Sequence, residues 1–193
     1  MTSPKKLWLQ ETQGGLSMSL LNLDHSKVEK RIIDDMSQGT EVFYDRRWEI
    51  TAELNSWLGS QLDLFRNKRV LVLGAGIGAE TVLLGKFADH LWINDLSPVA
   101  LELCGEQLKQ NGITNFSPLP GRYESLTLPE VDLVVACFLV YNTETLKAMQ
   151  AYLAEQSATF ILVNEALPAF HTLLKNHPHQ QLFQQHNAIG VSL

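Results

Sequence analysis

Cysteine, long apolar runs and net positive charge are all scarce in this chain of 193 residues. Two cysteines, Cys104 and Cys137, are too few for a disulfide framework or a cysteine-rich metal site, so we expect no metal centre and a reducing, cytoplasmic location. The most apolar run, residues 131–141, is about half as long as a bilayer-spanning helix, which predicts no membrane segment. Lys and Arg number 15 against 21 Asp and Glu, and this charge of −6 makes nucleic acid an unfavourable partner.

Hydrophobic residues make up 45% of the chain, the proportion of an ordinary globular protein. Two short extended runs around Gly14 and Gly15 predict a hairpin over residues 7–21. Apolar residues at helical spacing then predict helices over residues 24–36 and 48–58, the first with its apolar face formed by Val28, Ile32, Ile33 and Met36. We therefore expect an N-terminal extension over residues 1–47, packed on a second unit over residues 48–193.

From residue 69 onward, short apolar strands alternate with helices of roughly ten residues. The predicted strands cover residues 69–73, 91–94, 116–119, 133–139 and 159–163, and the helices between them cover 79–87, 98–110 and 144–156. Continuous apolar strands joined by helices are typical of a parallel sheet covered on both faces. The sequence therefore predicts an α/β, doubly wound fold. The remaining helix, 168–176, and strands, 181–185 and 188–193, predict a short antiparallel C-terminal sheet edge, whose exposure would allow a homodimer.

A glycine-rich turn follows the first strand of this sheet directly and leads into a helix. It contains Gly74, Ala75, Gly76 and Gly78, and Asp95 comes 21 residues after Gly74, at the end of the next strand. Glycines let a ligand approach the backbone, and a carboxylate at this distance can accept hydrogen bonds from the hydroxyls of a ribose. The spacing indicates a nucleoside pocket. The loop also fits the dinucleotide fingerprint, so an NAD(P)-dependent oxidoreductase stays an alternative.

The glycine run 70–80, the segment 94–101 and the strand 132–136 resemble the class I, seven-strand S-adenosylmethionine-dependent methyltransferases. The Asn-Asp-x-x-Pro-x-Ala form is most similar to the protein-lysine methyltransferase family that includes the electron-transfer-flavoprotein β-subunit lysine methyltransferase. The resemblance implies a Rossmann-like sheet, S-adenosylmethionine as cofactor, S-adenosylhomocysteine as product, and a protein or small molecule as methyl acceptor.

The same resemblance assigns roles to single residues in the cofactor site. The backbone of the glycine loop would hold the methionyl part of the cofactor, Asp95 would bind the ribose, and Leu96 would pack on the adenine. Arg122 and Tyr123 follow the third strand, where the family contacts the adenine amine, and Phe138 follows the fourth. Residues 41–48, with Tyr44 and Trp48, resemble a segment that covers the cofactor.

The methyl acceptor is expected at the carboxyl ends of the strands, beside Phe138, Tyr141, Asn164 and Glu165. The resembled lysine methyltransferases carry an acid, two residues and an aromatic after the fourth strand; here the acid position holds Phe138 and the aromatic is Tyr141. We predict catalytic roles for Tyr141 and for Glu165, with Glu144 as the other candidate for the missing charge. A cofactor-binding module without acceptor chemistry is a further alternative.

Overall fold

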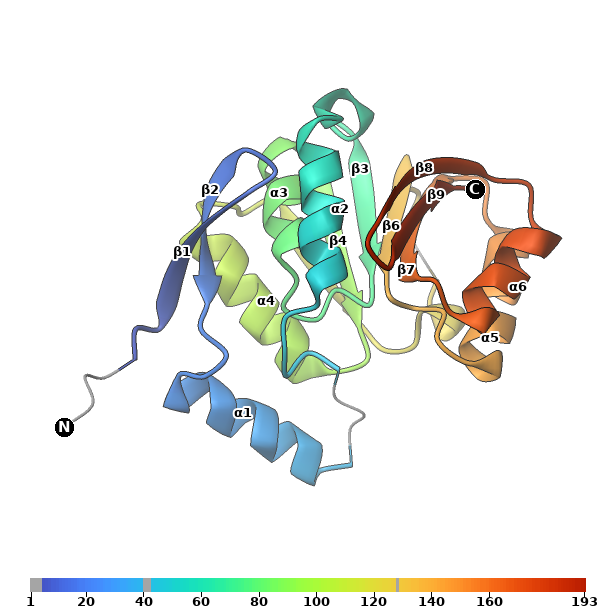
Figure 1. The fold of residues 1–193 in the computed structure, drawn as a ribbon. Helices are drawn as coiled ribbons and strands as arrows, with labels where there is room; N and C mark the ends of the chain where they lie inside the picture. The colour runs from blue at the N-terminus through green and yellow to red at the C-terminus, as the bar shows by residue number, and fades with distance from the viewer. Residues whose placement is uncertain (1–4, 40–42, 128) are drawn as a thin grey trace.

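The computed structural model describes residues 5–39, 43–127 and 129–193, and a seven-stranded sheet in the order β5-β4-β3-β6-β7-β9-β8 forms its centre (Figure 1). The strands and helices, in chain order, are β1 (Trp8–Gln13), β2 (Leu16–Leu21), α1 (Ser26–Ser37), α2 (Glu49–Gly59), β3 (Arg69–Leu73), α3 (Ala79–Phe87), β4 (His90–Asp95), α4 (Pro98–Gln110), β5 (Phe116–Pro120), β6 (Leu133–Cys137), α5 (Thr143–Glu155), β7 (Thr159–Glu165), α6 (Pro168–Asn176), β8 (Gln180–Gln185) and β9 (Ala188–Ser192). Strands β3 to β7 are parallel, whereas β9 runs antiparallel to both β7 and β8. The predicted α/β, doubly wound fold is confirmed.

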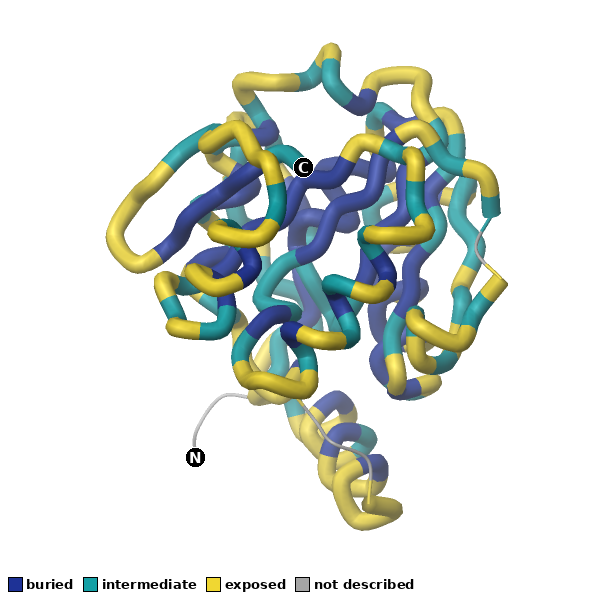
Figure 2. The backbone as a smooth tube through the Cα atoms, turned by 90° about the vertical axis from the view of Figure 1, so that its right-hand side faces the viewer, coloured by how far each residue is buried: buried dark blue, intermediate teal, exposed yellow. Residues whose placement is uncertain are grey.

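The two faces of the sheet are covered by different helices, because successive side chains of a strand point to opposite sides. On β3, Val70 and Val72 belong to the core formed with α2, α3 and α4, whereas Leu71 and Leu73 belong to the core formed with α5 and α6. Figure 2 shows the buried strands enclosed between more exposed helices and loops. Among the described residues, no helix is both long and apolar enough to cross a bilayer.

The N-terminal hairpin of β1 and β2 packs beside α4 and α2, away from the main sheet (Figure 1). Met18 and Leu20 enter the same core as α2 and α3. The backbone N–H of Ser19 donates to Oδ1 of Asn111 at 2.9 Å, and Nδ2 of Asn111 donates back to the Ser19 carbonyl at 2.7 Å. The predicted hairpin is confirmed, whereas the division of the chain at residue 48 stays a prediction.

Helix α1 corrects one detail of the predicted pattern. Val28 and Ile32 are buried as expected, but Ile33 and Met36 are 55% and 50% exposed, and Asp35 is buried at the position one helical turn beyond Ile32. The prediction that Ile33 and Met36 share the buried face was therefore wrong. Helix α1 packs against the rest of the protein along a narrow stripe of residues. The side chain of Asp35, which has buried hydrogen-bond partners, forms part of that stripe.

At the far edge of the sheet, β8 and β9 are short but complete the seven strands. β8 is the outermost strand, and its glutamines 180, 181, 184 and 185 are exposed. Polar side chains on an edge strand reduce its tendency to pair with another chain. A homodimer stays a prediction.

Candidate functional site

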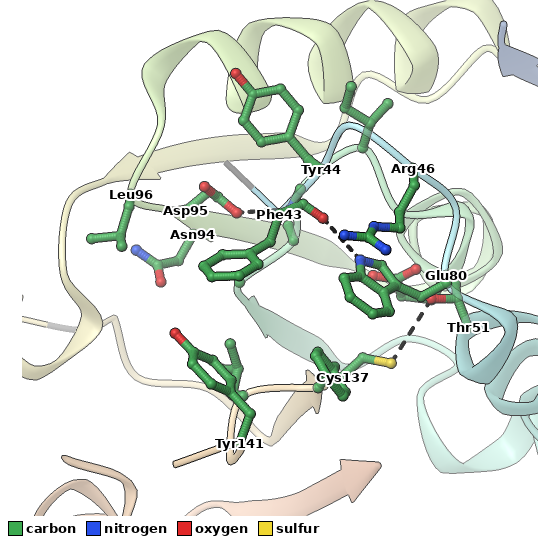
Figure 3. Close-up of a pocket in the computed structure, with 18 of the residues that line it drawn as sticks. Phe43, Tyr44, Arg46, Thr51, Glu80, Asn94, Asp95, Leu96, Cys137 and Tyr141 are labelled. Carbon is green, nitrogen blue, oxygen red and sulfur yellow. Dashed lines mark hydrogen bonds between the residues drawn. The ribbon is translucent and has the colours of Figure 1, made fainter. Parts of the chain in front are cut away.

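A cavity of about 450 Å³ opens at the carboxyl ends of β3, β4 and β6, next to the point where the strand order reverses (Figure 3). Its walls come from the loop after β3, the end of β4, the segment after β6, and residues 43–52 before and within α2. This is where doubly wound sheets bind their ligands, and the volume is that of a small-molecule site.

The loop after β3 depends on glycine for both its conformation and its space. Gly74 and Gly76 have φ angles of 62° and 50°, in the left-handed region. A Cβ atom on Gly74 would lie 2.5 Å from Cδ2 of Leu139, and one on Gly76 would lie 3.2 Å from Cβ of Tyr44. The loop lines the cavity, and because most of its residues are glycines, a ligand can approach its backbone closely. The residues are Gly74, Ala75, Gly76 and Gly78.

Asp95 is the last residue of β4, and its carboxylate is positioned by two backbone donors. Oδ2 accepts from the N–H of Gly76 at 2.8 Å, and Oδ1 accepts from the N–H of Ser97 at 2.9 Å. Burial raises the pKa of Asp95, although these hydrogen bonds act in the opposite direction. Each oxygen retains a lone pair, and Leu96 beside it is 47% exposed. The residues at this end of the cavity therefore fit the ribose and base of a nucleoside.

Behind Asp95, a buried hydrogen-bond network connects the site to the N-terminal helix. The hydroxyl of Ser97 donates to Oδ2 of Asp35 at 2.6 Å, and the hydroxyl of Tyr44 donates to the same oxygen. Burial and the Asp35 carboxylate raise the pKa of Tyr44. Ser97 also caps α4 by accepting from the N–H of Ala100 at 3.0 Å. Tyr44 lies in the predicted covering segment, of which residues 41 and 42 fall outside the described part.

The segment after β6 is held in an unusual backbone conformation. Phe138 has a φ angle of 57°, which is strained for a bulky aromatic residue. Its N–H donates to the carbonyl of Val163 at 2.8 Å. The buried side chain of Asn164 accepts from the N–H of Val140 at 3.0 Å and donates to the Val140 carbonyl at 2.9 Å. Asn164, a candidate acceptor contact in the sequence, thus bonds to the backbone of this segment.

Four aromatic side chains meet on the cavity wall next to this segment. Trp48 stacks on Phe138 with ring centroids 4.5 Å apart, and Tyr141 lies 6.0 Å from Phe138 and 5.5 Å from Phe43. The guanidinium of Arg46 lies 4.8 Å from the ring centre of Trp48. All of these residues line the cavity, so that it has a polar end at Asp95 and an aromatic wall at Phe138.

The other predicted site residues differ in their placement. Arg122, Tyr123 and Glu144 line the cavity; Arg122 is exposed and pairs with Glu124 at 3.1 Å. Glu165 is the last residue of β7, lies opposite Ala188 in β9, and is not one of the described residues that line the cavity. Its catalytic role stays a prediction.

The cavity also contains residues that the sequence analysis did not single out as site residues. Glu80, Thr51 and Arg46 line it together, at the end opposite Leu96 and Asp95 in Figure 3. Thr51 and Cys137 contact each other there, with the hydroxyl oxygen 3.9 Å from the thiol sulfur. No sequence signal marks Thr51, whereas Glu80 directly follows the glycine loop.

No family model matches the chain. The curated protein-lysine N-methyltransferase EFM3 of Chaetomium thermophilum is 26% identical over 163 residues, which cover 77% of this chain and 46% of that protein. The chain therefore spans about half the length of the curated relative that it matches.

Solved structures resemble the chain over most of its length. The T. thermophilus 16S rRNA N2 G1207 methyltransferase RsmC, in complex with AdoMet and guanosine, matches with a TM-score of 0.66 and 15% identity over 97% of this chain and 50% of that one. Ribosomal protein L11 methylase from Lactobacillus delbrueckii subsp. bulgaricus matches with a TM-score of 0.60 and 16% identity over 73% and 77%. A SAM-dependent methyltransferase from Aquifex aeolicus matches with a TM-score of 0.56 and 16% identity over 75% and 88%.

These likenesses show that the chain has the fold of the class I S-adenosylmethionine-dependent methyltransferases. The resemblance found in the sequence is confirmed for this fold class, and the curated match is to a lysine methyltransferase. The antiparallel strand β9 beside β7 also separates the sheet from the dinucleotide-binding arrangement, in which a parallel strand occupies that position.

Proposed function

We propose that the chain binds S-adenosylmethionine and transfers its methyl group to an amine nitrogen, most readily the side chain of a protein lysine. The observation that carries the proposal is the joint position of the glycine loop and Asp95 at the reversal of the strand order. The curated lysine methyltransferase and the class I fold support it. The chain spans only part of that relative, so the acceptor is inferred from the site.

The cofactor contacts are assigned by the chemistry of the cavity. Asp95 accepts hydrogen bonds from the ribose hydroxyls, and Leu96 packs on the adenine. Tyr123 lines the same cavity and makes a second apolar contact with the adenine. The open backbone of the glycine loop contacts the part of the cofactor that links its nucleoside to its amino-acid group. When bound, the cofactor supplies an activated methyl group on a positively charged sulfur.

The aromatic wall accounts for amine recognition without an acid at position 138. Phe43, Phe138 and Tyr141 line the cavity, and aromatic rings there attract a positive charge and stabilise it as it moves toward the acceptor nitrogen. An apolar surrounding also lowers the pKa of a buried amine, which helps it reach the neutral, nucleophilic form. The protein then contributes mainly alignment of the nucleophile, which accounts for a large share of such rate enhancements.

The test is methyl transfer from cofactor labelled in its methyl group, with purified protein and a cell lysate, followed by acid hydrolysis of the labelled product. We expect the label in methylated lysine, lost in Asp95→Ala and strongly reduced in Tyr141→Ala. Tyr141→Phe is the matched control, because it keeps the aromatic ring and removes only the hydroxyl. Label recovered in RNA would contradict the proposed acceptor, and binding of S-adenosylhomocysteine without any labelled acceptor would favour a cofactor-binding module.

A further inference from the structure

Glu80 carries a buried carboxyl group that forms no ion pair with any of the described residues. It is the second residue of α3 and only 3% exposed, and its Oε2 has no hydrogen-bond partner among the described residues. Burial raises the pKa of Glu80 to about 7. Removing a carboxylate from water without pairing it is costly, and a ligand in the cavity would supply the missing partner.

The position of Glu80 indicates which part of a ligand it would meet. Its carboxylate lies against the last glycine of the loop, so closely that a Cβ on Gly78 would overlap it. In Figure 3 it lies near Thr51, across the cavity from Asp95. A ligand that places its ribose at Asp95 and crosses the glycine loop therefore brings its opposite end to Glu80.

A cation is available near the same end for a group of the opposite charge. Three arginines line the cavity, but Arg122 pairs with Glu124 at 3.1 Å, and Arg47 already binds Glu11 at 2.8 Å and the Leu21 carbonyl at 2.6 Å. Arg46 has an ion pair only with Asp45, at 3.7 Å among the described residues, and its side chain is 65% exposed. This end of the cavity thus combines a buried carboxyl group, which a bound ammonium would hold in its ionised form, with an exposed, weakly paired cation. That pair of charges suits an amino-acid zwitterion.

We propose that Glu80 binds the α-ammonium group of the cofactor's amino-acid part and that Arg46 lies beside its α-carboxylate. The inference rests on the proposed cofactor, and it adds the side chains that distinguish the complete cofactor from its nucleoside portion. Glu80 is a specificity residue in this assignment: the ammonium supplies the partner that Oε2 lacks, and the methyl-transfer step itself does not involve it.

The experiment compares two ligands in calorimetric titrations of the whole chain. S-adenosylhomocysteine carries the amino-acid part, whereas 5′-methylthioadenosine keeps the adenosine and the thioether but lacks it. We expect Glu80→Gln to raise the dissociation constant of S-adenosylhomocysteine about tenfold or more. The dissociation constant of 5′-methylthioadenosine should change less than about twofold. Asp95→Ala is the control for the nucleoside end and should weaken both ligands.

The outcomes separate this inference from the proposed function. If the wild-type chain binds neither ligand, the cofactor proposal fails and the role of Glu80 fails with it. If it binds both and Glu80→Gln leaves both unchanged or weakens both equally, the cofactor proposal stands and the role of Glu80 is wrong. Thermal unfolding checks that the Glu80→Gln variant is folded. Because glutamine removes a buried ionisable group, the unfolding midpoint of the variant should not be lower than that of the wild type.

Discussion

Glu80→Gln should flatten the pH dependence of the chain's stability. Burial raises the pKa of Glu80 from 4.5 to about 7 in the folded protein. Between those values the folded state holds a proton that the unfolded chain has released, so the free energy of unfolding of the wild type decreases as the pH rises. Glutamine carries no titrating proton, and this loss disappears in the variant.

The size of the effect follows from the shift in pKa. A change from 4.5 to about 7, at about 1.4 kcal/mol per pH unit, corresponds to about 3 kcal/mol of stability. The stabilising contribution is complete below the unfolded value and lost as the pH passes the folded value. Two thiols interact electrostatically with Glu80, those of the buried Cys104 and the partly buried Cys137, and desolvation raises the pKa of both. They stay neutral in this window and do not obscure the effect.

Urea unfolding of the wild type and of Glu80→Gln, from about pH 4 to about pH 8, measures the difference directly. Contributions from other titrating groups cancel in that difference, which should grow by about 3 kcal/mol in favour of the variant. Glu49→Gln is the matched control, since Glu49 lines the same cavity but is exposed. A difference that stays constant within about 0.5 kcal/mol would refute the reasoning, because the carboxylate would then be solvated.

Three further substitutions, one of them with a control, test the site. Gly74→Ala should destabilise the chain by about 1–2 kcal/mol and weaken S-adenosylhomocysteine in a titration, because the left-handed φ and the nearby Leu139 oppose a Cβ. Gly15→Ala is the control: Gly15 is also at positive φ, but apart from its chain neighbours no described residue lies within 4 Å of its Cβ, so binding should be unchanged. Asn164→Leu should cost about 2–4 kcal/mol in urea unfolding, since both backbone groups of Val140 lose their partner. Tyr44→Phe should cost about 1–2 kcal/mol in the same assay by removing a hydroxyl from a buried network, and an unchanged midpoint would contradict that account.

The sheet could be predicted from the sequence because its strands are nearly continuous runs of apolar residues. Helices α3, α4 and α6 have the predicted bounds, since a cap or proline begins two of them and the glycine loop leads directly into α3. The strand predicted to end at residue 139 ends at Cys137, because Phe138 turns into a left-handed conformation that no local pattern encodes. Strand β7 extends to Glu165 because it pairs with β9, a contact between distant segments.

The polar residues behind the cavity could not be predicted, because their burial depends on elements distant in the sequence. Asp35 resembles any solvent-facing helix residue until Tyr44 and Ser97 supply its partners. Glu80 resembles an ordinary acid in the first turn of a helix, a position that the helix dipole favours. Asp95 was recognisable because its spacing from the glycine loop is set by one strand, one helix and a turn, all local in sequence.

The contacts between the N-terminal hairpin and α4 set an order of events during synthesis. Ser19 and Asn111 are 92 residues apart in the chain, and their two hydrogen bonds can form only after α4 has been made. At ribosomal rates of about 5–20 residues per second, the hairpin waits roughly 5–20 s for its partner. During that time Met18 and Leu20 lack their core neighbours, and closing so long a loop carries an entropic cost. The hairpin is thus translated early but reaches its native position late.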